Sequence, residues 1–391
     1  MMDMLKDKKI VLVGPVYPYK GGIAHYTSLM YRTLSQRYDV ELISYKMQYP
    51  KLLFKREQKD YQNDVFQVSD AQFVINTANP LNIADVALGI KKKRPDLVII
   101  QWWHPYFAPC YYIMEAVLGR NVKKMFVCHN VFPHERFPAD RILTKAVLGR
   151  ADYFLLHSQS DIGELLSVCP QAKYIQNPHP TYNAFRIRNI TKKQARAELL
   201  PSACGDEKIL LFFGFVREYK GLRHLIAAMP GVRRKLGNVR LIIAGTFGRD
   251  RDEYLHLIDE KRVGDCISVV DGYIPDHDVE KYFAACDIVV LPYESATQSG
   301  IVQIAYGFGK PVIATSVGGL PDVVADGQTG YIVERGNEKQ LADAIVRYYQ
   351  DNMEETFEAN IRKEAERFSW DRLAEKVDAL LGGCRDGQTV N

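Results

Sequence analysis

The chain has 391 residues, and at about 100–200 residues per domain this length allows two or three domains, each with its own core. Hydrophobic residues make up 47% and charged residues 25%, so wholesale disorder is excluded, and 27 Gly and 18 Pro exclude a collagen-like or low-complexity chain. The net charge of +4 is too small to indicate nucleic-acid binding, and no apolar run approaches the roughly 18–20 residues of a membrane span.

The charge is unevenly distributed along the chain. Residues 1–180 hold 23 Lys and Arg against 16 Asp and Glu, whereas the remainder holds 28 against 31. A basic first half suits an anionic partner such as phosphate groups or a membrane surface, and solvated surface lysines explain it equally well. The N-terminal MMDMLKDKK mixes acids with bases, so we expect no signal peptide. Seven scattered cysteines without a CxxC pair predict a reducing compartment and structural thiols.

Short runs rich in Val, Ile and Leu alternate with longer helical patterns. A first series of such runs predicts strands at Lys9–Gly14, Val40–Ser44, Leu97–Gln101, Met125–Cys128 and Tyr153–His157. A second series predicts strands at Ile209–Gly214, Val239–Gly245, Ile267–Val270, Ile288–Leu291, Val312–Thr315 and Tyr331–Val333. Apolar strands spaced by helices are typical of parallel sheets covered on both faces, so the two series predict two doubly wound α/β domains.

The two series are separated by the stretch Asn177–Thr191, in which two prolines interrupt a polar sequence. We expect the linker there, with a first domain of residues 1–185 and a second of residues 186–369. The tail, Glu364–Leu381, has the apolar periodicity of a helix.

Three turns that follow predicted strands contain residues suited to binding an anion. The first is the loop after Gly14, where Gly21 and Gly22 come just before a helix, so that backbone N–H groups and the helix dipole can hold a phosphate. A plain strand-to-helix turn would look the same. The loop matches neither the GK[ST] pattern of a P-loop nor GxGxxG, so a nicotinamide-binding fold is disfavoured.

The second turn carries Arg217 and Lys220 at the carboxyl end of a predicted strand, where open parallel sheets bind ligands. An arginine fork with a lysine point charge can clamp a diphosphate. The third turn follows Leu291 and runs into a helix at about Ser299, offering hydroxyl and amide groups that can bond sugar hydroxyls. Its proposed donor-binding residues are Glu294, Thr297, Gln298, Ser299, Gly300, Ile301 and Val302.

With these motifs the chain resembles the retaining glycosyltransferases of family 4 (group 1), which have the GT-B fold. The resemblance spans nearly the whole chain and rests on Lys20-Gly-Gly-Ile, Lys220-Gly-Leu, Gly309-Lys-Pro-Val-Ile-Ala-Thr, Gly318-Gly-Leu-Pro-Asp-Val-Val, Asp326-Gly-Gln-Thr-Gly-Tyr-Ile-Val and Phe368-Ser-Trp. It implies two Rossmann-like domains facing across a cleft, with a C-terminal helix, about residues 370–391, crossing back to the first domain. It also implies a nucleotide-diphosphate sugar as donor and no cofactor. Gly272, Tyr273 and Ile274 match the place where the family's base stacks.

The chain also departs from the family pattern. The arginine that usually follows the glycine of the clamp strand is Phe215 here, and Arg217 is its substitute by position. The family has two glutamates eight residues apart, and aligned on Gly300 these positions hold Thr297 and Ala305. Thr297 can still bond a hydroxyl, but Ala305 cannot bind ribose.

Histidines follow two strands of the first domain. His129 matches a family position whose histidine lies beside the donor sugar, and we expect it to be catalytic together with Arg217 and Lys220. His104 and His134 read more often as structural residues.

The paired aspartates Asp250/Asp252 and Asp276/Asp278 resemble a metal-binding pattern, but they also suit helix starts, so no metal is expected.

The sequence therefore predicts a retaining, metal-independent hexosyltransferase that uses a UDP- or GDP-linked sugar and a saccharide or lipid-linked acceptor. We expect it in cell-envelope polysaccharide synthesis, in the cytoplasm or peripherally on the inner face of the membrane, with no nucleic-acid partner. The alternative is a catalytically weak sugar-nucleotide-binding partner protein, which the missing glutamates suggest. Two stretches join bases to apolar residues that could contact an anionic membrane, Lys51–Arg56 and the stretch with Phe132, Arg136, Phe137 and Arg141.

Overall fold

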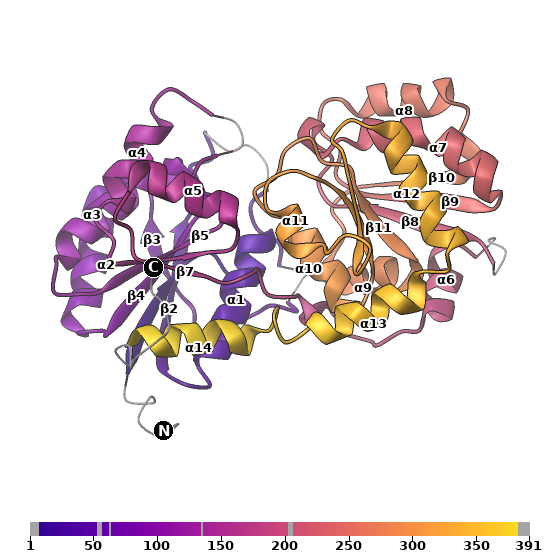
Figure 1. Cartoon of the computed structure of the whole chain (residues 1–391). Helices are drawn as coiled ribbons and strands as arrows, with labels where there is room; N and C mark the ends of the chain where they lie inside the picture. Colours follow the sequence, from indigo (N-terminus) through magenta and orange to yellow (C-terminus); the bar gives the residue numbers. More distant parts are fainter. Residues whose placement is uncertain (1–7, 53–56, 62–63, 134–135, 202–205, 382–391) are drawn as a thin grey trace. The chain divides into compact units, whose positions relative to one another are not determined.

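The computed structural model describes residues 8–52, 57–61, 64–133, 136–201 and 206–381 (Figure 1). The chain forms two compact units, Met1–Pro180 with Ser369–Asn391 and Thr181–Phe368. The chain therefore passes between the units just before the short 3-10 segment η2 (Asn183–Phe185) and again after Phe368.

The first unit is built on a seven-stranded parallel sheet with the order β3-β2-β1-β4-β5-β6-β7. Its strands are β1 (Lys9–Val13), β2 (Asp39–Met47), β3 (Gln72–Asn76), β4 (Leu97–Trp102), β5 (Lys124–Cys128), β6 (Tyr153–Leu156) and β7 (Tyr174–Gln176). The order reverses between β1 and β4, which is the switch point at which doubly wound sheets bind ligands.

Alternate residues of these strands enter two separate cores, because successive side chains of a strand point to opposite faces. Leu12 and Ile99 belong to one core, whereas Val13 and Ile100 belong to the other. This two-sided burial explains why the strands read as continuous apolar runs in the sequence.

Helices cover both faces of this sheet. They are α1 (Gly22–Leu34), α2 (Pro80–Lys92), α3 (Ala108–Leu118), α4 (Asp140–Leu148), α5 (Gln159–Val168) and α14 (Trp370–Leu381), with the 3-10 segment η1 (Pro105–Phe107). The last helix, α14, packs beside α1 and contributes Leu373, Ala374 and Val377 to the same core as Leu12. The expected C-terminal helix on the first domain is thereby confirmed.

The second unit is built on a six-stranded parallel sheet with the order β10-β9-β8-β11-β12-β13, and its switch point lies between β8 and β11. Its strands are β8 (Lys208–Phe213), β9 (Val239–Gly245), β10 (Ile267–Asp271), β11 (Ile288–Leu291), β12 (Val312–Thr315) and β13 (Gly330–Val333). The prediction of two doubly wound α/β domains is confirmed.

The remaining helices of the second unit cover its sheet on both sides (Figure 1). They are α6 (Lys192–Leu199), α7 (Leu222–Leu236), α8 (Arg251–Glu260), α9 (Asp276–Ala285), α10 (Gly300–Gly307), α11 (Leu320–Val323), α12 (Glu338–Gln350) and α13 (Glu354–Glu364), with the 3-10 segments η3 (Glu218–Lys220) and η4 (Gly264–Cys266). Neither unit, as far as it is described, contains a helix long and apolar enough to cross a membrane.

The two strands that the sequence pattern does not predict are the edges of the first sheet, β3 and β7. Their residues are mostly exposed or only partly buried. A partly exposed edge strand needs no continuous apolar run, so its sequence carries little signal.

Candidate functional site

The carboxyl ends of β8 and β11 bring the second and third predicted turns together at the switch point of the second sheet. After β8, Arg217 is the N-cap residue of the 3-10 segment η3 and Lys220 is its last residue. The backbone N–H of Glu294, in the turn after β11, donates a hydrogen bond of 2.7 Å to the carbonyl of Tyr219. Residues 217–220 and 292–299, about 70 positions apart, therefore form one surface.

Gly221 allows this approach of the two turns. Its backbone has φ +62°, and a Cβ atom there would lie 1.9 Å from the carbonyl oxygen of Pro292. Any other residue would both strain the backbone and push the turns apart. The Lys220-Gly221 pair of the motif thus has a local structural reason.

Lys220 is the most electrostatically constrained group of this surface. Its ammonium lies 5.6 Å from the ring centroid of Tyr293 and 3.2 Å from the place that a Cβ on Gly214 would take. Burial and, secondarily, the positive charge of Arg217 lower the pKa of Lys220 to about 8. An anion bound here would stabilise the charged form of Lys220.

The carboxylate of Glu294 lies at the border of the same surface. The side chain of His224, from α7, donates from Nε2 to Oε1 of Glu294 at 3.1 Å, and its Nδ1 lies 3.4 Å from Oε1 of Glu338. Nη1 of Arg335 donates to the backbone carbonyl of Glu294 at 3.2 Å. Sequence reasoning missed His224 and Arg335, because neither lies in the turns that the sequence singles out.

The third turn ends at the N-terminus of α10, where Ser299 is the N-cap residue and Gly300 the first helical residue. The loop of this turn is held by the Gly318-Gly319 pair, because the N–H of Gly319 donates to the carbonyl of Thr297 at 2.9 Å. A Cβ on Gly318 would lie 1.5 Å from the carbonyl oxygen of Ala296. The first N–H groups of an α-helix lack partners within the helix, so this loop presents donors suited to an anion.

The two departures from the family pattern fall on this segment. Ala305 is fully buried within α10, so the helix offers no ribose-binding side chain at that position. Thr297 lies in the loop before the helix, and its hydroxyl, unlike the glutamate of the family pattern, carries no charge.

The proposed base-stacking residues follow the edge strand β10. Gly272 has φ +150°, and its N–H donates to the carbonyl of Gly245 at 3.3 Å. Tyr273 donates from its hydroxyl to Oδ1 of Asp276 at 3.2 Å, and Ile274 is partly exposed. This loop lies at the carboxyl edge of the same sheet as the Lys220 turn, because all strands of the sheet are parallel.

In the first unit, the glycine loop leads directly into α1. Gly21 is the N-cap residue with φ +109°, a conformation that favours glycine, and Gly22 opens the helix. The N–H groups of Ala24 and His25 both donate to the carbonyl of Gly21. The loop therefore has the backbone of a helix start, and its binding of an anion stays a prediction.

His129 follows β5 and is held by a residue of the neighbouring strand. Its Nε2 donates to Oε1 of Gln101, at the end of β4, over 2.7 Å. Burial, and next the nearby His179, lower the pKa of His129 to about 3, so the ring is neutral at pH 7. With Nε2 protonated, Nδ1 is left as the acceptor.

Two more histidines share the environment of His129. The ring of Tyr26 packs edge-on against His129, His157 and His179, with centroids 4.7, 5.3 and 5.0 Å away. Sequence reasoning missed Gln101, His157 and His179, because only the order of the strands brings these positions together.

Of the other histidines, His104 accepts from the N–H of Tyr106 at 3.0 Å and so caps η1, which agrees with a structural role. His134 lies outside the described residues.

The paired aspartates lie at helix starts. Asp250 is the N-cap residue of α8, and Asp252 lies in its first turn. The N-cap of α9 is Pro275, and Asp276 and Asp278 lie in the first turn of that helix. In the described parts of the chain, no group of three or more His, Cys, Asp or Glu side chains could hold a metal ion.

In the second of the expected membrane-contacting stretches, Phe132 belongs to the core, Phe137 is partly buried, and Arg136 and Arg141 are exposed. Phe132 is 5% exposed, and the guanidinium of Arg136 lies 4.1 Å from its ring centroid and pairs with Asp140. Phe132 therefore offers no apolar side chain to a membrane, because it is packed in the core of the first unit. Of Lys51–Arg56, residues 53–56 lie outside the described residues, and Leu52 is 86% exposed.

Comparisons with known proteins find similarity to glycosyltransferases. Residues 207–351 match the family model of the group 1 glycosyl transferases. The chain is 28% identical over 269 residues to the D-inositol 3-phosphate glycosyltransferase of Corynebacterium glutamicum, covering 65% of this chain and 62% of that protein. The match thus spans less than two thirds of that relative's length.

Solved structures share the fold over both units. HepE of Anabaena, solved in complex with UDP and glucose, superposes with a TM-score of 0.72 at 17% identity, covering 96% of this chain and all of that chain (100%). Sucrose-phosphate synthase of Thermosynechococcus elongatus has a TM-score of 0.69 at 20% identity, covering 95% and 98%. The expected GT-B architecture of two doubly wound domains is confirmed.

Proposed function

We propose, from the membership of residues 207–351 in the group 1 glycosyl transferases, that this chain moves a hexose-type sugar from a nucleotide-diphosphate donor to an acceptor. The observation that carries the proposal is the switch point of the second sheet. There, burial lowers the pKa of Lys220. The turn that carries Lys220 is hydrogen-bonded to the turn after β11, which leads to the N-terminus of α10. This is the chemistry that a leaving diphosphate requires.

In the proposed reaction, the bond between the anomeric carbon and the diphosphate oxygen breaks while the acceptor hydroxyl attacks the same face. Configuration is then retained, and the acceptor proton passes to a phosphate oxygen. Arg217, Lys220 and the first N–H groups of α10 stabilise the growing negative charge, a contribution of roughly 2.7–4 kcal/mol for each well-placed donor. The proposed mechanism uses no metal or other cofactor.

The first unit is proposed to serve the acceptor, a saccharide or a lipid-linked saccharide. His129 is neutral at pH 7 and held by Gln101, so it can accept a hydrogen bond from a sugar hydroxyl without carrying charge. Gly21 and Gly22 are proposed to contribute backbone donors. A place in cell-envelope polysaccharide synthesis on the inner side of the membrane suits such an acceptor.

A second function is suggested by Thr297 and Ala305, which replace both glutamates of the family pattern. A chain lacking these carboxylates can bind a sugar nucleotide and act only as a partner protein. Slow release of free sugar from the donor, in the absence of acceptor, is expected only of the active transferase and distinguishes the two.

The first experiment is a thermal-unfolding panel with UDP, GDP and ADP. The matching nucleotide at one hundred times its dissociation constant should add about 2.7 kcal/mol to the free energy of unfolding.

Donor turnover is then compared in Lys220→Ala, Arg217→Ala and the control Arg234→Ala, an exposed arginine of α7. We expect about a hundredfold loss in the first two variants and none in the control. Near-normal turnover in both would remove the clamp.

A further inference from the structure

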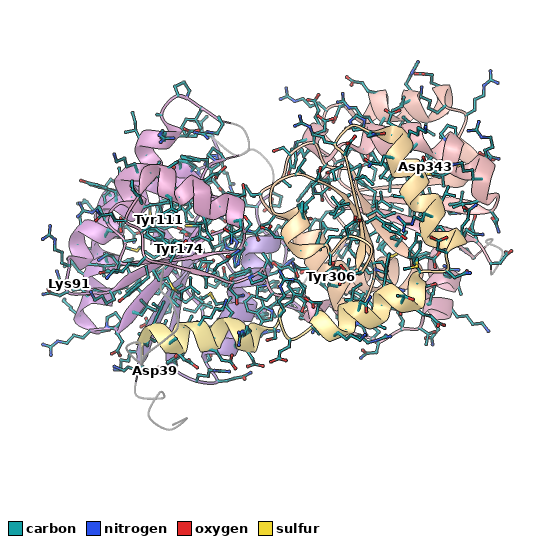
Figure 2. The ribbon with its side chains drawn as sticks, viewed as in Figure 1. Asp39, Lys91, Tyr111, Tyr174, Tyr306 and Asp343 are labelled. Carbon is teal, nitrogen blue, oxygen red and sulfur yellow. The ribbon has the colours of Figure 1, made fainter. Side chains whose placement is uncertain are left out.

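The second unit contains a cavity of about 800 Å³ that none of the proposed donor-binding residues lines. It is bounded by the segment after Thr181, the start of α6, the end of α10 and the length of α13. Tyr306, labelled in Figure 2, lies on its wall and donates to the carbonyl of Val323 at 3.3 Å. The volume lies within the range of small-molecule sites.

A buried lysine faces this cavity. The side chain of Lys310 is 8% exposed, and its ammonium makes one hydrogen bond, of 3.4 Å, to Oε1 of Glu358. The carboxylate of Glu354 lies 4.0 Å away, beyond hydrogen-bond distance. An ammonium has three N–H donors, so within the described chain two of them have no acceptor. Buried charges are normally hydrogen-bonded, and this one is incompletely so.

The carboxylates of the lining are mostly occupied. Glu280 accepts from three backbone N–H groups, at 2.6–3.1 Å, and Glu354 accepts from Lys192 at 2.5 Å. Glu358 is the partner of Lys310. Glu355 is exposed, where water solvates it.

The cations of the lining differ in their partners: Lys192 is paired with Asp287 and Glu354, whereas Arg186 and Arg362 are exposed to solvent. The guanidinium of Arg186 lies 5.2 Å from the ring centroid of Phe308, and no described residue accepts a hydrogen bond from it. Arg362 has only an ion pair of 3.8 Å with Glu358. The cavity therefore presents the buried ammonium of Lys310, with N–H donors left over, and two exposed guanidinium groups, on Arg186 and Arg362.

We infer that this cavity binds a phosphomonoester. A phosphate group has the acceptor oxygens that a guanidinium fork and an ammonium bind together. The cavity is larger than a phosphate ion, and Phe308, Ile361 and Phe368 give it apolar walls for an organic remainder. The site is separate from the proposed diphosphate clamp and does not depend on the proposed transfer reaction.

The test is a titration of the full chain with inorganic phosphate, and then with glycerol 3-phosphate, followed by ³¹P NMR. The parent is Lys220→Ala, so that the clamp does not contribute. In this parent, Arg186→Gln should weaken phosphate binding at least tenfold, and Arg234→Gln, with an equally exposed arginine outside the cavity, should leave it unchanged. Lys310→Met should abolish binding, and Arg186→Gln keeps the test valid if that variant does not fold.

Vesicles distinguish the source of the phosphate. Co-sedimentation with phosphatidylcholine vesicles containing phosphatidic acid, lost in Arg186→Gln, would assign a lipid headgroup, whereas binding of glycerol 3-phosphate alone would assign a soluble phosphomonoester. The inference is overturned if phosphate binding is absent in the Lys220→Ala parent, or if Arg186→Gln and Arg234→Gln bind phosphate equally.

Discussion

At the scale of single residues, the environment of Lys220 suits the proposed binding of an anion. Burial disfavours its ammonium, and Arg217 adds a like charge, so its pKa falls from the usual 10.5 to about 8. The cost of holding this charge in the free protein is recovered when an anion binds beside it. A residue selected only for packing would not need a second cation nearby.

This lowered pKa predicts how nucleotide affinity depends on pH. Below about 8 Lys220 is charged, and above it the proton is lost, so the affinity for UDP or GDP should fall as the pH rises through about 8. Isothermal titration at pH 6.5 and 9.5 should show about tenfold weaker binding at the higher pH. In Lys220→Met the same comparison should be nearly flat; an equal loss in that variant would assign the titration to another group.

His129 differs from Lys220, because its environment keeps the imidazole ring uncharged at pH 7. We expect His129→Ala to lose most of the turnover while nucleotide affinity stays close to wild type, since the residue belongs to the first unit and is proposed to meet the sugar. Because the pKa of His129 is about 3, its protonation should add no inflection to the rate between pH 5 and 8. Kinetics and nucleotide titration on the same variant check this. A parallel loss of nucleotide affinity would refute the assignment.

At the scale of elements, α14 is the segment whose place depends most on distant residues. Leu373, Ala374 and Val377 are fully buried in the core beside α1. Arg37, just after α1, donates to Asp378 at 2.7 Å, so a charge pair marks the same contact. Most stabilisation of such an amphipathic helix comes from its apolar face rather than from its propensity.

Removal of one apolar side chain from this face measures its contribution. Leu373→Ala should lower the free energy of unfolding by about 2–5 kcal/mol, because the side chain of Leu373 is fully buried and its removal leaves a cavity. Glu375→Ala, on the exposed face of the same helix, should change it by less than about 0.5 kcal/mol. Denaturant unfolding of both variants makes the comparison, and similar values would mean that α14 does not contribute as a packed element.

At the scale of the whole molecule, the basic surplus of residues 1–180 remains the argument for an anionic surface. Phe132 no longer supports it, because this residue is core, whereas Leu52 is exposed beside Lys51. An exposed leucine beside bases is suited to the interface of an anionic bilayer.

We therefore expect co-sedimentation with vesicles containing anionic lipid at low salt and its loss at high salt. Each base near the surface contributes about 1 kcal/mol and is screened within a Debye length. Leu52→Asp should weaken the binding, and Leu81→Asp, at another exposed leucine, provides the control. Binding that ignores lipid charge would remove the electrostatic argument and favour a soluble saccharide acceptor.

Many elements of this protein can be predicted from residues that are adjacent in the sequence. The inner strands are apolar on both faces and appear as runs, and the glycines at 21 and 221 mark turns with a positive φ that other residues adopt only at a cost in free energy. The motif around Lys220 could be found for the same reason, since turn and helix start are neighbours in the chain.

Only the tertiary structure decided which distant residues meet. Gln101 holds His129 because β4 and β5 are neighbours, and His224 holds Glu294 because α7 follows β8 while residue 294 follows its neighbour β11. The cavity around Lys310 likewise depends on where α13 packs. Such pairs leave no trace in local periodicity, because sheet order and helix packing result from burial over the whole unit, not from the residues adjacent in sequence.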